Sequence, residues 1–181
     1  MQCSLVADAS SFVRVNRKNC EQMDQTRTFS PEERAEIERL KQRYPHPKAA
    51  LMPVLWMAQK KWGWLSDDVM RTVADVMDLP YAHVLGVARF YTMYFKKPMG
   101  TYHIQVCTNV SCMLRGGDEL FERLCNKLGI GHGERTPDGR FSIEEVECMG
   151  ACGGAPMIAI NEEYYENVTI EDVERILETL P

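Results

Sequence analysis

The stretch TYHIQVCTNVSC at residues 101–112 decides the fold of the C-terminal half of the chain. Apolar and polar side chains alternate from Tyr102 to Val106, which is the period of a half-buried β-strand. Cys107 ends this predicted strand, and Cys112 follows it in a C-x4-C spacing. The sequence therefore predicts a strand followed directly by a loop that carries two cysteines.

A second pair of cysteines stands in CMGAC at residues 148–152, at the end of a second predicted strand over residues 141–148. Neighbouring strands of a sheet lie about 4.8 Å apart, so loops at their ends can meet in space. We therefore expect a single metal site, whose predicted ligands are Cys107, Cys112, Cys148 and Cys152.

The lengths of the two cysteine loops indicate which metal they suit. Structural zinc usually takes short C-x2-C loops, whose tight turn aims both sulfurs at one small ion. The C-x4-C and C-x3-C loops of this chain are longer and suit a binuclear iron–sulfur cluster, for which ligation by four cysteines is the rule. The spacing favours the cluster, and a structural zinc module stays open as the alternative.

The remaining cysteines and the histidines are not predicted to be ligands. Cys125 lies on the apolar stripe of a predicted helix, so we expect it to be a small core residue. Cys3 and Cys20 lie near the N-terminus, outside any motif. The histidines show no ligand spacing and are expected to be structural or exposed; they are His46, His83, His103 and His132.

The rest of the C-terminal half completes a small α+β or α/β domain around the two cysteine loops. A helix is predicted in GGDELFERLCNKLGI at residues 116–130, and TPDGR at residues 136–140 is a turn. APMIAIN at residues 155–161 predicts a strand, a short further strand is possible at Tyr164, and Thr169 caps a closing helix. We expect about four strands and two helices.

The N-terminal half predicts a small helical bundle. FSPEER at residues 29–34 is typical of a helix start, with Ser30 as N-cap and Glu33 closing a capping box. Further helices are predicted from Lys48, from Ser66 after a stop at Gly63, and from Pro80. The predicted domains are a flexible tail at residues 1–29, a helical domain at residues 30–97 and the cysteine-bearing domain at residues 98–181.

Composition and charge exclude several classes of function. The net charge of -5 and the pI near 5.4 argue against a nucleic-acid partner, because phosphate binding needs a basic surface. The sequence has no apolar run near the roughly 20 residues of a spanning helix, so we expect no direct membrane insertion. No secretion signal is evident, which predicts a cytoplasmic protein with reduced thiols and favours metal ligation over disulfides.

Motifs for binding or transforming a small substrate are missing from the sequence. It contains no G-x-G-x-x-G, no P-loop and no nucleophile motif of an acyl-transfer enzyme. A thiol–disulfide oxidoreductase is disfavoured because no C-x2-C stands at the start of a helix. We therefore predict no catalytic residue on this chain and a separate partner that binds the substrate.

These motifs together strongly resemble a known family. The loops, the turn RTPDGRF at residues 135–141, the stretch VECMGACGGAPMI at residues 146–158 and the upstream HVLGVARFYTMYF at residues 83–95 carry the likeness. The chain resembles the thioredoxin-like 2Fe-2S subunit, of the type called E in bacteria, of the NADH dehydrogenase module of respiratory complex I (NADH-quinone oxidoreductase). The likeness covers about residues 30–180.

The resemblance implies a function beyond what the spacing shows. It implies a helical domain followed by a thioredoxin-like ferredoxin domain, in which Cys107 and Cys112 bind one iron and Cys148 and Cys152 bind the other. It also implies a flavoprotein subunit that holds FMN and binds NADH, and exchanges single electrons with this cluster. The location would be peripheral to the inner membrane, on the matrix side in a mitochondrion. Similar subunits serve NAD-linked hydrogenases and formate dehydrogenases, which are the alternative.

Overall fold

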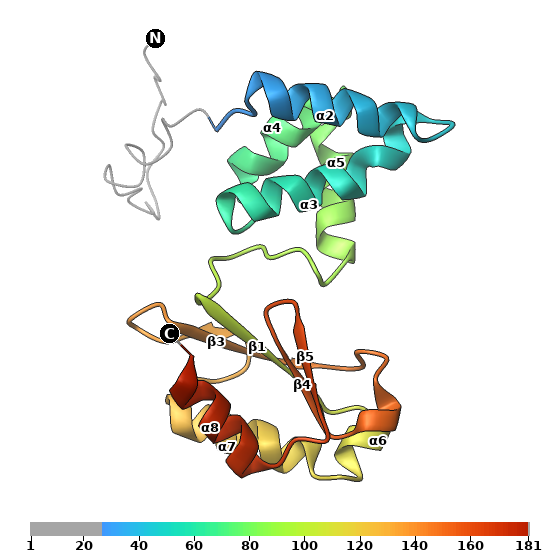
Figure 1. Cartoon of the computed structure of the whole chain (residues 1–181). Coiled ribbons are helices and arrows are strands. Elements are labelled where there is room, and N and C mark those ends of the chain that lie inside the picture. Colours follow the sequence, from blue (N-terminus) through green and yellow to red (C-terminus); the bar gives the residue numbers. More distant parts are fainter. Residues whose placement is uncertain (1–26, 181) are drawn as a thin grey trace, which may run out of the picture. The chain divides into compact units, whose positions relative to one another are not determined.

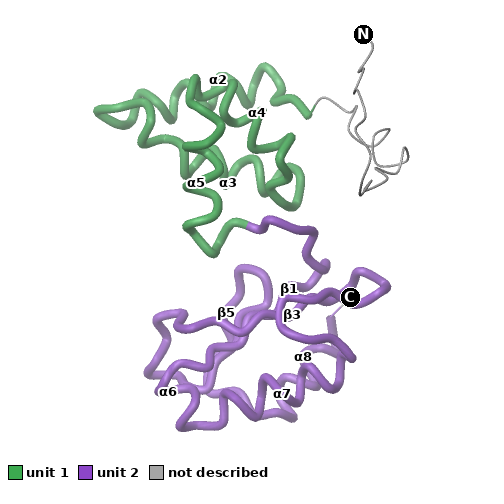
Figure 2. Tube along the Cα trace, turned by 180° about the vertical axis from the view of Figure 1, so that it is seen from behind, with its two compact units in different colours: residues 1–94 green, residues 95–181 purple. Residues whose placement is uncertain are grey.

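The computed structural model describes residues 27–180, which form two compact units (Figure 1). The division falls between Tyr94 and Phe95, whereas the sequence pattern predicts it after residue 97 (Figure 2). Most of the predicted tail at residues 1–29 lies outside the described residues. Phe29 is described and is buried, with its ring centroid 4.9 Å from that of Trp62, so the helical unit starts before residue 30.

The N-terminal unit is helical, as predicted. Its elements are α2 (Pro31–Gln42), the 3-10 helix η1 (Pro47–Ala50), α3 (Leu51–Trp62), α4 (Asp67–Met77) and α5 (Tyr81–Phe90). The predicted capping box is confirmed, because Glu33 N donates to Ser30 Oγ and Ser30 N donates to the Glu33 carboxylate. Gly63 ends α3 with a φ of 80°, and Ser66 caps α4.

Apolar side chains from α2, α3, α4 and α5 form one core in this unit. Val54, Leu55 and Val73 have no exposed surface. Tyr94 is the last residue of this unit. Its side chain is buried, and its hydroxyl donates a hydrogen bond to Met52 O at 2.8 Å. Pro53 is the third residue of α3, so its missing N–H removes no bond from the helix.

The C-terminal unit contains one mixed sheet in the order β2-β3-β1-β4-β5. The strands are β1 (Tyr102–Cys107), β2 (Glu134–Arg135), β3 (Phe141–Val146), β4 (Met157–Ile160) and β5 (Glu163–Glu166). The central pair β1 and β3 is parallel, and the other pairs are antiparallel. Cys107 pairs with Val146, so both cysteine loops begin at the carboxyl ends of these two neighbouring strands.

Two helices cover one face of this sheet. In Figure 1, α7 (Gly117–Leu128) and α8 (Ile170–Thr179) lie side by side against it. Their apolar faces pack on Ile104, Val106 and Ile143 of the central strands, which are fully buried. The predicted α+β class is confirmed.

Two short elements differ from what the sequence pattern predicts. The pattern predicts a loop after Cys107, but the segment contains the one-turn helix α6 (Val110–Met113), capped by Asn109. The pattern does not predict the two-residue strand β2, so the sheet has five strands instead of about four. Elements this short do not complete a hydrophobic period, so the sequence pattern does not reveal them.

Polar side chains occupy part of the opposite face of the sheet. His103 is 3% exposed, and its Nδ1 lies 2.9 Å from Ser142 Oγ and its Nε2 lies 3.0 Å from Glu144 Oε2. Ser142 Oγ also accepts from Gly100 N at 2.9 Å. Every polar atom of the imidazole therefore has a partner, as a buried polar group requires.

The Glu144–His103 contact predicts a pH-dependent stability. The hydrogen bond to His103 lowers the pKa of Glu144 from its ordinary value. The ionised Glu144 carboxylate therefore contributes to the free energy of unfolding above its unfolded-state pKa of about 4.3. This contribution is lost as the pH falls through the lower pKa of the folded state. We expect Glu144→Gln to lose about 1 kcal/mol of unfolding free energy at pH 7 and to unfold with a shallower acid slope.

Denaturant titrations of the full chain between pH 7 and pH 3 measure this effect. Glu178→Gln is the control, because Glu178 is exposed near the end of α8. Equal slopes for wild type and Glu144→Gln would contradict the prediction.

None of the helices formed by residues 27–180 has the length and apolarity needed to cross a lipid bilayer.

Candidate metal centre

Regular secondary structure holds the first cysteine pair. Cys107 is the last residue of β1, and Cys112 lies in α6. The two residues are 3% and 2% exposed and pack against Ala155 and Met157. Thr108 fastens the start of the loop to β3, because its N donates to Val146 O at 3.1 Å.

The second cysteine pair lies in an irregular segment at the surface. Cys148 follows β3, and Cys152 begins the 3-10 turn η2 (Cys152–Gly154). Both are exposed, and their Sγ atoms are 4.0 Å apart. Gly150, with a φ of 77°, directs its N–H to Cys148 Sγ at 3.4 Å. Such a donor stabilises negative charge on the sulfur.

The two pairs are close enough to influence one another electrostatically. Burial, together with the hydrogen bond to Cys107, raises the pKa of the Cys112 thiol to about 11. The charge of Cys152, from the other pair, acts on Cys112 in the same direction. Metal binding would therefore release the proton of Cys112. Loops 35 residues apart in the sequence therefore lie near one another, and Met149 and Ala151 of the second loop pack against the first cysteine pair.

The arrangement of the sulfurs can be compared with the needs of the two groups that the sequence indicates, a zinc ion and a binuclear iron–sulfur cluster. Within residues 27–180, no three His, Cys, Asp or Glu side chains converge on a single point. Two sulfurs on one tetrahedral metal at about 2.3 Å lie about 3.8 Å apart, which is close to the separation of Cys148 and Cys152. A mononuclear zinc site needs four donors around one ion, whereas a binuclear cluster takes cysteines in pairs. Two cysteine pairs are the ligand arrangement that a binuclear cluster takes.

The other cysteine that the structure describes behaves as predicted. Cys125 lies in α7, half-buried against the apolar core of the C-terminal unit. Burial raises the pKa of its thiol. The predictions for Cys3 and Cys20 concern positions outside the described residues.

Sequence reasoning missed two polar contacts that hold the cysteine loops. Thr108 Oγ1 donates to Glu145 Oε1 at 2.8 Å, which ties the first loop to the strand before Cys148. Tyr164 of β5 donates its hydroxyl to Met149 O at 3.2 Å, inside the second loop. Each contact joins residues that are distant in sequence, so local patterns carry no signal of them.

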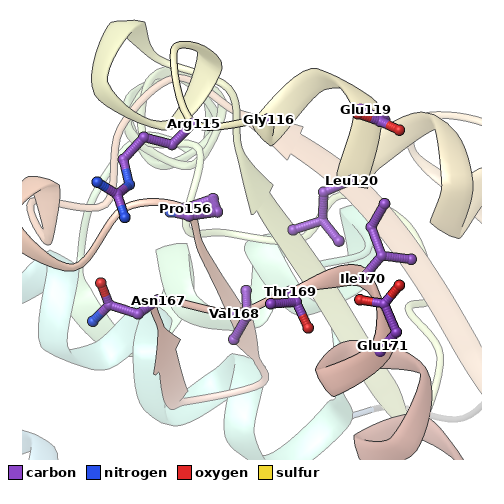
Figure 3. Close-up of a pocket in the computed structure, with 10 residues that line it drawn as sticks. All are labelled: Arg115, Gly116, Glu119, Leu120, Pro156, Asn167, Val168, Thr169, Ile170 and Glu171. Carbon is purple, nitrogen blue, oxygen red and sulfur yellow. The ribbon is translucent and has the colours of Figure 1, made fainter.

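A cleft of about 490 Å³ lies beside the first cysteine loop (Figure 3). Arg115, three residues after Cys112, stands at its rim, and Leu120 and Val168 contribute apolar surface. Glu119 and Glu171 line it on the side of α7 and α8. Its lining contains neither cysteine nor histidine, so the four predicted ligands do not line it.

The family follows from a comparison with known proteins. The family model of the thioredoxin-like [2Fe-2S] ferredoxins matches residues 37–181. The chain belongs to the thioredoxin-like [2Fe-2S] ferredoxin family. This membership confirms the resemblance inferred from the sequence and assigns the C-terminal unit a thioredoxin-like fold. It also favours an iron–sulfur cluster over zinc as the group that the family's cysteines hold.

Two similar proteins are E-type subunits of an NADH-quinone oxidoreductase. The E-type subunit of the NADH-quinone oxidoreductase of Rickettsia bellii is 44% identical over 134 residues, which cover 74% of this chain and 80% of that protein. An E-type subunit of the NADH-quinone oxidoreductase of Rhizobium meliloti is 41% identical over 146 residues, which cover 81% of this chain and 87% of that protein. The similarity therefore includes both the helical and the ferredoxin parts of this chain.

A solved structure shows the same fold at lower identity. The NAD+-reducing [NiFe]-hydrogenase in its H2-reduced state matches with a TM-score of 0.60 and 24% identity. The match covers 71% of this chain and 22% of the hydrogenase chain. At this identity the likeness concerns the fold alone.

Proposed function

We propose that this chain is the electron-transfer subunit of an NADH:quinone oxidoreductase and carries one [2Fe-2S] cluster. The observation that carries the proposal is that two cysteine pairs follow the neighbouring parallel strands β1 and β3, with the Sγ atoms of Cys148 and Cys152 4.0 Å apart. When bound, such a cluster accepts and returns one electron at a time. The E-type relatives above 40% identity favour this complex over a NAD-linked hydrogenase or a formate dehydrogenase.

The chain's own residues would shield one side of the cluster and leave the other open. Cys107 and Cys112 are buried, so they hold their iron away from water. Cys148 and Cys152 are exposed, so electrons can enter and leave on this side. The Gly150 N–H favours the more negative, reduced state, while the excess of acidic over basic side chains in residues 95–181 opposes it.

We propose that the partner is a flavoprotein subunit that holds FMN and oxidises NADH. Among the described residues of the C-terminal unit, the exposed large apolar side chains are Val110, Met113, Leu114 and Tyr164. All of them belong to the cysteine loops or touch them. Exposed apolar side chains beside a redox site are typical of a protein-docking surface. Through this partner the chain would be peripheral to the inner membrane.

A spectroscopic experiment tests the cofactor. We expect anaerobically purified protein to hold two irons and two acid-labile sulfides per chain, and to give one spin-half EPR signal after dithionite reduction. Colourless protein with stoichiometric zinc would overturn the proposal. The isolated chain is expected not to oxidise NADH with a dye acceptor, and to do so only with the flavoprotein.

Partner binding is expected to depend on Leu114, which is 77% exposed. Leu114→Glu would place a charge in the apolar surface and should weaken binding to the flavoprotein subunit at least about tenfold. Tyr44→Glu, which changes an exposed apolar residue of the helical unit, is the control. Titration of each variant against the flavoprotein by calorimetry gives the dissociation constants. Unchanged binding of Leu114→Glu would exclude this surface.

A further inference from the structure

The two cysteine pairs are anchored by different means. The buried pair belongs to β1 and α6, whose backbone hydrogen bonds hold it. Of the exposed pair, Cys148 follows β3 and Cys152 begins the short 3-10 turn η2, so no strand ladder holds this segment. Its shape therefore depends on contacts from neighbouring elements.

Strand β5 provides those contacts. Tyr164, at one end, donates to the carbonyl of Met149, the residue after Cys148. At the other end Glu166 packs so closely on Gly154 that a Cβ there would come within 1.9 Å of its carboxylate. Asn167 N, just after the strand, donates to Gly154 O at 2.7 Å. These contacts lie on either side of Cys152 in the sequence.

The position of Tyr164 is set by the sheet itself. It pairs with the buried Ala159 of β4, so its backbone cannot shift without breaking the antiparallel ladder. Tyr165 points to the opposite face because side chains alternate along a strand. The Tyr165 hydroxyl donates to Glu163 and does not reach the cysteine loop.

We propose that Tyr164 is a positioning residue that holds the Cys148–Cys152 pair at the spacing that one iron requires. This inference rests on the proposed function and assigns a role to a residue outside the four cysteines. The hydroxyl fixes the Met149 carbonyl, and the 4.0 Å between the two Sγ atoms is already near the value for one tetrahedral metal. Without this hydroxyl the second cysteine loop would adopt several conformations. Iron would then dissociate more readily, and the environment of the cluster would differ from molecule to molecule.

The matched pair Tyr164→Phe and Tyr165→Phe tests this role. Each change removes one hydroxyl from adjacent positions of β5. On the full, cluster-loaded chain, transfer of iron to bathophenanthroline disulfonate after dithionite reduction should be about threefold to tenfold faster for Tyr164→Phe than for wild type. Tyr165→Phe should match wild type. The EPR lines of reduced Tyr164→Phe should also broaden, and its midpoint potential should shift.

The stability of the cluster-free chains separates a positioning role from a purely structural one. A positioning role predicts that Tyr164→Phe and Tyr165→Phe unfold at similar temperatures without the cluster, because Tyr164 is 54% exposed. A purely structural role predicts that Tyr164→Phe unfolds at a lower temperature. Tyr164→Leu, which also removes the ring edge, should release iron at least as fast as Tyr164→Phe. Wild-type rates and spectra in Tyr164→Phe, or equal changes in Tyr165→Phe, overturn the inference. A wild-type chain without a cluster would instead overturn the proposed function, and this inference with it.

Discussion

Serine in place of Cys107, Cys112, Cys148 or Cys152 is expected to lower the iron bound per chain more than about tenfold. A hydroxyl is a harder and weaker ligand for iron than a thiolate, so the cluster loses one of its four bonds. The expected result is loss of the brown colour and of the EPR signal of the reduced protein. Iron and labile sulfide analysis of each variant measures the effect.

Cys125→Ser is the matched control for these variants. Its side chain is half-buried on α7 and packs against the core of the C-terminal unit. We expect full iron content and an unchanged EPR signal, with a small loss of stability from a hydroxyl in an apolar environment. Equal losses from all five serine variants would mean that the ligands are assigned wrongly.

Replacement of Gly100 by alanine is expected to cause the largest loss of stability. A Cβ at this position would lie 2.3 Å from Phe141 C and 2.6 Å from Ser142 N, both backbone atoms of β3. Neither atom can move away without breaking the parallel pairing of β1 with β3. Overpacking of this kind costs about 3 kcal/mol, which should lower the melting temperature of the C-terminal unit by about 10 °C or more.

Gly86→Ala provides a control of opposite sign. Gly86 lies within α5, and apart from its chain neighbours and the backbone of its own helix no atom lies within 4 Å of the added Cβ. Alanine in a helix interior should stabilise the chain by about 0.5 to 1 kcal/mol, because glycine loses more backbone entropy on folding. Circular dichroism melts give the melting temperatures of both variants. A Gly100→Ala protein as stable as wild type would contradict the close approach of Gly100 to the backbone of β3.

The helices illustrate what could be predicted from local sequence. Ser30, Ser66 and Thr169 cap the helices that the sequence predicts them to cap, and Gly63 ends α3. These signals are local, because a cap bonds to a backbone group two or three residues away. The short elements α6 and β2 carry no such signal, and the sequence pattern predicts neither.

For the candidate site, the sequence by itself determined which residues are the predicted ligands and which kind of cofactor they suit. Each cysteine pair follows a strand, and the loop lengths favour a binuclear cluster whatever the detailed packing. The tertiary structure alone decided that β1 and β3 are parallel neighbours and that one pair is buried while the other is exposed. It also decided that Tyr164 reaches Met149 and that Gly100 lies against β3. Strand and helix periods act over a few residues, whereas these contacts join segments far apart in the chain and arise only when the sheet assembles.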